Sequence, residues 1–146
     1  MSAPADIIAG LRAALLADEM TAAACGGRVF GGAVPAGEAR SMPRSALLVR
    51  PSGGASLTAG SDIEHDTQRV DLFAYGANGE HAASLIAIAR AALTRLRREV
   101  HAGVLIHWVQ SGGGFTVGLE PGVDWPRAMQ SFQVFHTLDE VAEPTN

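Results

Sequence analysis

Histidine and cysteine supply the side chains that could do chemistry in this sequence. The histidines are His65, His81, His101, His107 and His136. No two of them stand at the HxH or HExxH spacing that brings two imidazoles to one metal ion. The neighbours of His107 and His136 favour positions on strand faces, and a solvated strand start explains His65 beside Asp66. We therefore predict no metal site and no cofactor.

Cys25 is the only cysteine, which excludes an internal disulfide and a multi-cysteine zinc site. A cysteine nucleophile needs a nearby base and an oxyanion pocket, and the sequence around Cys25 indicates neither. Cys25 is better explained as a small hydrophobic side chain that packs in the core. All eleven cationic side chains are arginine, and the absence of lysine excludes a Schiff base and a Walker-type phosphate loop. We predict that the protein is not an enzyme.

A glycine triplet, residues 112–114, could be taken for a phosphate cradle. Such cradles follow a strand and open a helix, whereas this triplet is followed by the strand-like residues Phe115-Thr116-Val117. The triplet therefore predicts a hairpin between strands at 104–110 and 115–119.

Length and composition limit the class of protein. The chain has 146 residues, of which 47% are hydrophobic and 18% charged, as expected for a globular domain with one core. The formal net charge of −4 argues against a general nucleic-acid binder. The apolar runs are far shorter than the about 20 residues that span a bilayer, and no signal peptide is evident near the N-terminus.

The elements that must position these residues follow from hydrophobic spacing. Ile7, Leu11 and Leu15 recur at helical spacing after a candidate N-cap, Asp6. Apolar residues from Ala82 to Val100 form one stripe and predict a long helix over 80–100. Strands are expected at 28–30, 45–50, 63–75, 104–110, 115–119 and 129–137, with the segment 22–27 ending the first helix and a loop at 33–44.

This order predicts an α+β fold with a mainly antiparallel sheet packed against a long helix and a shorter N-terminal helix. We expect a single domain over residues 1–138 and a flexible acidic C-terminal tail over 139–146.

Two sequence features suggest contacts with a partner. Arg90, Arg95, Arg97 and Arg98 gather toward the end of the long helix, where the helix dipole favours cations and where they could also pair with an acidic neighbour. Trp125 lies in a predicted loop, either as an exposed anchor or tucked back over the sheet. Loops 52–62 and 120–128 are further candidates. The predicted contact residues are Arg95, Arg97, Arg98, Leu57, Asp62 and Trp125.

Four segments carry a resemblance to a known family. They are an Ala/Leu helix at 8–16 followed by Gly27-Arg28-Val29-Phe30, a strand at 70–76, a helix at 83–93 and a terminal strand at 129–135. Together they resemble the small tail-completion, or tail-terminator, proteins of long-tailed (siphovirus-like) phages and of prophage-derived, gene-transfer-agent-like particles. The resemblance covers about residues 6–137, and the segment 122–126 departs from the family pattern.

The resemblance implies a structural virion protein. Such a protein caps the tail tube as a hexameric ring, ends tube polymerisation and provides the head–tail joining surface. Its implied partners are itself, the tail-tube protein and the head–tail connector protein, with no membrane, and its implied place is the head–tail junction of a virion assembled in the bacterial cytoplasm. Six chains of −4 would carry −24, which would repel phosphate and let genome DNA pass without specific binding.

Two alternatives stay open. One is a head-closure or neck (connector) protein at the same junction, which composition does not distinguish from a terminator. The other belongs to a different class, a small metal- or ligand-binding domain that uses the histidines.

Overall fold

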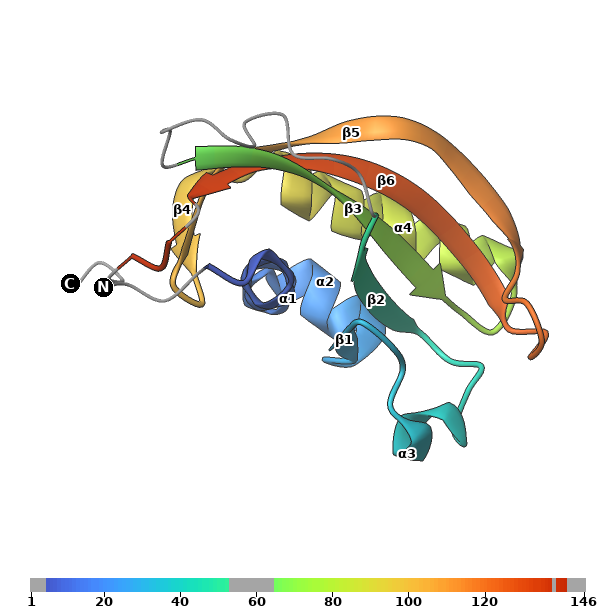
Figure 1. Cartoon of the computed structure of the whole chain (residues 1–146). Helices are drawn as coiled ribbons and strands as arrows, with labels where there is room; N and C mark the ends of the chain where they lie inside the picture. Colours follow the sequence, from blue (N-terminus) through green and yellow to red (C-terminus); the bar gives the residue numbers. More distant parts are fainter. Residues whose placement is uncertain (1–4, 53–64, 138, 142–146) are drawn as a thin grey trace.

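A curled, six-stranded sheet is the frame of the molecule (Figure 1). The computed structural model describes residues 5–52, 65–137 and 139–141. The strands are β1 (Val29–Gly31), β2 (Ala46–Pro51), β3 (His65–Tyr75), β4 (Arg97–His101), β5 (Val104–Leu119) and β6 (Pro126–Thr137), in the order β1-β2-β3-β6-β5-β4. The helices are α1 (Ile7–Ala17), α2 (Glu19–Cys25), α3 (Ala36–Ala39) and α4 (Gly79–Thr94). β1 is parallel to β2 and the other strand pairs are antiparallel, which confirms the predicted fold class.

The main core lies between the concave face of the sheet and three helices, α1, α2 and α4 (Figure 1). Leu11 of α1 and Ile86 of α4 meet Leu72 and Phe132 of the sheet there, and all four are almost fully buried. A second, smaller apolar cluster lies on the opposite face, around Phe73 and its strand neighbours. The side chains of β3 alternate between the two clusters: Val70, Leu72 and Ala74 join the main core, while Phe73 and Tyr75 join the second cluster.

The N-terminal helix begins where the sequence predicts. The Asp6 carboxylate accepts hydrogen bonds from the backbone N–H groups of Ile8 (3.1 Å) and Ala9 (3.2 Å), as an N-cap residue does. The segment 22–27, predicted only to end this helix, instead completes a second helix, α2. Asp18 caps α2, and Gly26 ends it in the left-handed conformation at φ +62°. Within the predicted loop 33–44, α3 forms a single short turn.

The long helix is shorter than predicted. α4 begins at the N-cap Asn78 and ends at Thr94, not at residue 100. The Arg97 guanidinium donates to the carbonyl oxygens of Thr94 (2.8 Å) and Leu96 (2.7 Å), which occupies acceptors that the next helical turn would use. Residues 97–101 then pair with β5 as β4. The apolar spacing predicted a longer helix because Leu96 and Val100 are also shielded from water, Leu96 in the connection between α4 and β4 and Val100, half-buried, in β4.

The predicted hairpin at the glycine triplet is also wrong. β5 is one continuous strand that pairs with β6 on both sides of the triplet. The register of this pairing shifts between the pairs Ser111–Phe132 and Phe115–Gln130. Residues 112–114 therefore lie opposite the single residue Ser131 and form a β-bulge. Glycine suits such a bulge because it bends a strand without placing side chains against its neighbour.

Candidate assembly surface

Each of the five histidines lies on a different helix or strand. His107 and His136 are on β5 and β6, as predicted, and the His107 ring lies 4.9 Å from the Phe135 ring. His136 is buried, and its Nδ1 lies 2.7 Å from the Thr137 carbonyl oxygen. Within the described ranges, no group of three or more His, Cys, Asp or Glu side chains is placed to hold a metal ion. Cys25 is fully buried in the main core at the end of α2, the packed position that the sequence favours.

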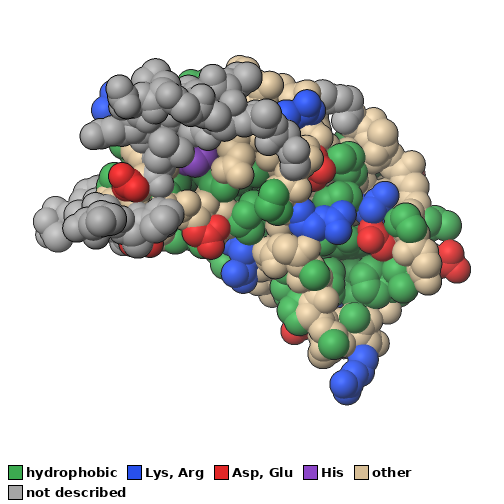
Figure 2. Space-filling view, viewed as in Figure 1, with side chains coloured by type: hydrophobic (Ala, Val, Ile, Leu, Met, Phe, Trp, Pro, Cys, Tyr) green, Lys and Arg blue, Asp and Glu red, His purple; other side chains and the backbone are tan. Residues whose placement is uncertain are grey.

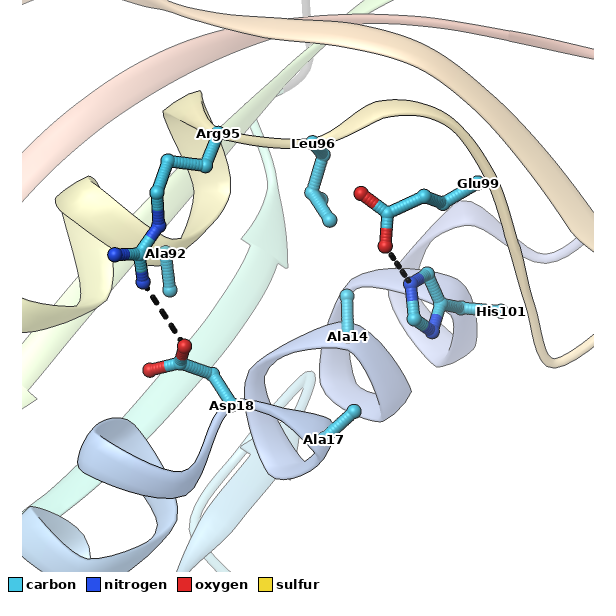
Figure 3. Close-up of a pocket in the computed structure, with 8 residues that line it drawn as sticks. All are labelled: Ala14, Ala17, Asp18, Ala92, Arg95, Leu96, Glu99 and His101. Carbon is cyan, nitrogen blue, oxygen red and sulfur yellow. Dashed lines mark hydrogen bonds and ion pairs between the residues drawn. The ribbon is translucent and has the colours of Figure 1, made fainter.

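A polar hollow of about 320 Å³ lies between the ends of α1 and α4 and strand β4 (Figure 3). An ion pair between Arg95 and Asp18 (2.9 Å) and a contact between the His101 ring and the Glu99 carboxylate (3.4 Å) line it. The Thr21 hydroxyl donates to the other Asp18 oxygen at 2.7 Å. Hydrogen bonds from Thr21, assisted by the charge of Arg95, lower the pKa of Asp18 below its ordinary value. The Asp18–Arg95 ion pair therefore ties the junction of α1 and α2 to the end of α4.

The predicted arginine cluster is divided by the end of α4. Arg95 is the C-cap of α4 and pairs with Asp18, although its side chain is 64% exposed. Arg97 binds the carbonyl of Thr94, the last residue of α4, and that of Leu96 just after it. Arg98 is an exposed residue of β4 at φ +51°. The expectation that these residues share the end of one helix is wrong, because the chain turns into a strand after Leu96.

Trp125 is tucked back over the sheet. It is half-buried, and its ring meets the Tyr75 ring edge-on at 5.7 Å. The Tyr75 hydroxyl donates to Glu120 (3.2 Å), and Arg127 also binds this carboxylate (2.7 Å). Figure 2 shows hydrophobic side chains, with arginine and acidic side chains among them, on the side of the molecule where β5 connects to β6. Leu57 and Asp62, the other predicted contact residues, lie outside the described residues.

Sequence reasoning missed the largest exposed hydrophobic side chains. In the described part of the chain these are Leu16, Met20, Phe115, Val117, Leu119 and Val123. Leu16 and Met20 lie at the α1–α2 junction, whereas Phe115, Val117 and Leu119 alternate along the end of β5. The pattern F-x-V-x-L predicts a strand, but only the paired structure shows that this strand end is left partly uncovered.

Shallow hollows run along both flanks of α4. One of about 240 Å³ lies between α4 and Met20, and another of about 210 Å³ lies between α4 and Phe115. On the outward side of α4, the small residues Ala87 and Ala91 are exposed beside Arg90. Apolar ridges and hollows of this kind are typical of protein–protein contact surfaces. No helix in the described ranges is long and apolar enough to cross a membrane.

Comparisons with known proteins agree with a structural role. The model of the family described as "Tail completion protein gp17" matches residues 9–137. A chain of a solved structure, described as the virion of a native gene transfer agent particle, matches with a TM-score of 0.64 at 15% sequence identity. The match covers 90% of this chain and 94% of that one. No curated protein matches. The chain belongs to the family of tail completion protein gp17, and it is a structural tail protein of a phage-like virion.

Proposed function

We propose that this protein caps the tail tube as a hexameric ring, ends tube polymerisation and provides the surface that joins tail to head. The observation that carries the proposal is the family match over residues 9–137. The shared fold with a chain of a gene transfer agent particle supports it, since the two chains cover one another almost completely.

The distribution of exposed apolar side chains supports assembly into a ring. A closed ring of identical subunits needs two different patches that fit one another on each subunit. The flanks of α4 carry apolar side chains from separate elements, Met20 on one flank and Phe115 on the other. Such side chains would be shielded from water when neighbouring subunits meet, at roughly 25 cal/mol for each Å² of apolar surface buried.

Charge is consistent with passage of the genome. Six chains, each with a formal charge of −4, would give a ring of −24. Binding to DNA depends on neutralising phosphates with cations, so an acidic ring would let DNA slide through. In this proposal the protein acts by contact and without catalysis, and it binds the tail-tube protein on one side and the head connector on the other.

Arg98 is the predicted contact residue best placed to meet a partner. Among the described residues its side chain takes part in no hydrogen bond or ion pair, whereas Arg95 and Arg97 are engaged within the chain. We propose that Arg98 pairs with a carboxylate of a neighbouring protein. Arg98→Glu should then weaken attachment to the tail without lowering the free energy of unfolding.

Electron microscopy of particles from a strain that lacks this gene tests the function. Tails should be overlong or misshapen and detached from filled heads, and the wild-type gene supplied in trans should restore them. Tails of normal length beside heads that leak DNA would instead make this a neck protein. Particles that look normal and stay infectious would refute both roles.

A further inference from the structure

Two of the sheet edges in the described structure are protected against pairing with another chain. β1 has three residues, and the Arg12 side chain covers its edge by donating to the Val29 carbonyl oxygen at 3.0 Å. β4 carries three consecutive exposed charges, Arg97, Arg98 and Glu99. Short strands and edge charges are the usual means by which monomeric proteins prevent edge-to-edge association.

The end of β5 has no such protection. β4 pairs with β5 only as far as Trp108, so residues 109–119 have β6 as their one strand partner in the described structure. This stretch contains no charged residue and no proline. After the bulge at 112–114, residues 115–119 pair regularly with β6. Their other edge is therefore a row of main-chain donors and acceptors open to a further strand.

The side chains beside this edge would suit an added strand. Phe115, Val117 and Leu119 are 45%, 50% and 57% exposed and lie on one face, because alternate residues of a strand share a face. Phe115 also lines the hollow of about 210 Å³ beside α4, together with Ala83, Ala87 and Arg90. A strand laid along β5 could place an inward side chain in this hollow, next to the Arg90 guanidinium.

We propose that the edge of β5 at residues 115–119 binds an extended segment of a neighbouring copy of this chain, by main-chain hydrogen bonds and by a side chain that enters the hollow between α4 and β5. This inference rests on the proposed ring. The pairing is head-to-tail: two copies that joined their β5 edges symmetrically would close as a dimer, whereas a ring needs two different patches.

Charge complementarity at Arg90 supports a second copy as the occupant. Each chain carries −4, and two copies repel least where they meet along a strand end without acidic side chains. Arg90 is the one charged residue that lines the hollow. A second copy offers carboxylates for it, since Glu19, Asp124 and Asp139 are exposed and form no ion pair within the described ranges.

Matched lysine substitutions test this pairing. Val117→Lys places a charge beside the β5 edge, and Ala36→Lys adds the same charge at an exposed residue of α3, outside the sheet. Ring formation, alone or on purified tail-tube protein, is measured by sedimentation and electron microscopy, and circular dichroism shows that each variant folds. Val117→Lys should weaken assembly about 30-fold or more, while Ala36→Lys should stay within about twofold of the wild type.

Hydrogen exchange on the wild type gives an independent measurement that needs no variant. Amides within residues 115–119 that face the open edge should exchange slowly in the ring and fast in the monomer. The pairing would be overturned if Val117→Lys formed rings as readily as the wild type, or if these amides exchanged fast in the ring. Either result would leave the proposed function intact. If Val117→Lys forms rings that do not stay attached to tail tubes, the β5 edge binds tail-tube protein, and the proposal that a second copy of this chain occupies it is wrong. A wild type that never assembles would refute both the ring and the pairing.

Discussion

Asp18 joins three helices, and removal of its carboxylate should cost much more stability than the loss of one surface ion pair. One oxygen accepts from the Thr21 N–H (3.0 Å) and the Thr21 hydroxyl (2.7 Å), which caps α2. The other accepts from Arg95 at the end of α4 (2.9 Å). The Asp18 backbone N–H also donates to the Leu15 carbonyl at the end of α1 (3.3 Å).

The cost of Asp18→Ala can be worked out contact by contact. Loss of an N-cap side chain costs about 1 kcal/mol. The Thr21 side chain belongs to a fully buried residue, and a buried hydroxyl left without its acceptor costs about 1–3 kcal/mol. The ion pair contributes about 0–1 kcal/mol, since the Arg95 side chain is 64% exposed. The free energy of unfolding should therefore fall by about 2–5 kcal/mol.

Urea unfolding at neutral pH, followed by circular dichroism, measures this change. Two variants serve as controls: Arg95→Ala removes only the ion pair and should cost at most about 1 kcal/mol, and Asp18→Asn keeps an oxygen that can cap α2. If Arg95→Ala costs as much as Asp18→Ala, the ion pair carries the stability and the reasoning from the buried hydroxyl is wrong. A cost below about 0.5 kcal/mol for Asp18→Ala would refute the cap as well.

The pH dependence follows from the same contacts. The hydrogen bonds from Thr21 lower the pKa of Asp18 below its ordinary value of 3.8. As the pH falls, the unfolded chain takes up this proton first, so the stabilisation is complete above 3.8 and is lost as the pH falls through the lowered pKa. Asp18→Asn should remove this part of the acid sensitivity and leave the rest of the profile unchanged.

Three further changes have expected outcomes. Leu11→Ala, at a fully buried position of α1, should lower the free energy of unfolding by about 2–5 kcal/mol, and a loss below about 1 kcal/mol in urea unfolding would contradict the core described above. Ala102→Asn should raise it by about 0.5–1 kcal/mol, because Ala102 and Gly103 form the β4–β5 turn with φ +50° and +78°; an unchanged midpoint would show that this turn stores no strain. Burial, with the nearby Glu120 charge, raises the pKa of Tyr75 well above its ordinary 10.0, so stability should fall as the pH rises past 10.0 in the wild type but not in Tyr75→Phe. Since Tyr75 is the only tyrosine, phenolate absorbance in the folded protein at its ordinary pKa would refute this.

Local signals predicted most of the elements correctly. Asp6 before a helical repeat predicts the start of α1, and the Asp6 carboxylate does cap it. The alternation of residues 70–75 predicts a strand with two different faces, and those faces line the two apolar clusters. Such signals act over a few residues, so the tertiary structure does not need to be known to read them.

Where local and long-range preferences compete, the sequence misleads. Leu96 and Val100 continue the helical repeat, yet the chain leaves the helix because residues 97–101 gain a strand partner in β5. The glycine triplet looks like a turn, yet β6 continues past it and makes it a bulge. In both cases a partner distant in sequence decides the outcome, as the context dependence of strand formation leads one to expect.

The sequence by itself determined the α+β class, the alternating strands and, through its family resemblance, the role in a tail. Only the tertiary structure decided which apolar residues stay exposed and which strand edge stays open. Phe115, Val117 and Leu119 have the pattern of an ordinary core strand, but α4 and β4 stop short of covering them. Exposure and edge pairing depend on where distant elements end in space, and no local pattern of residues encodes that.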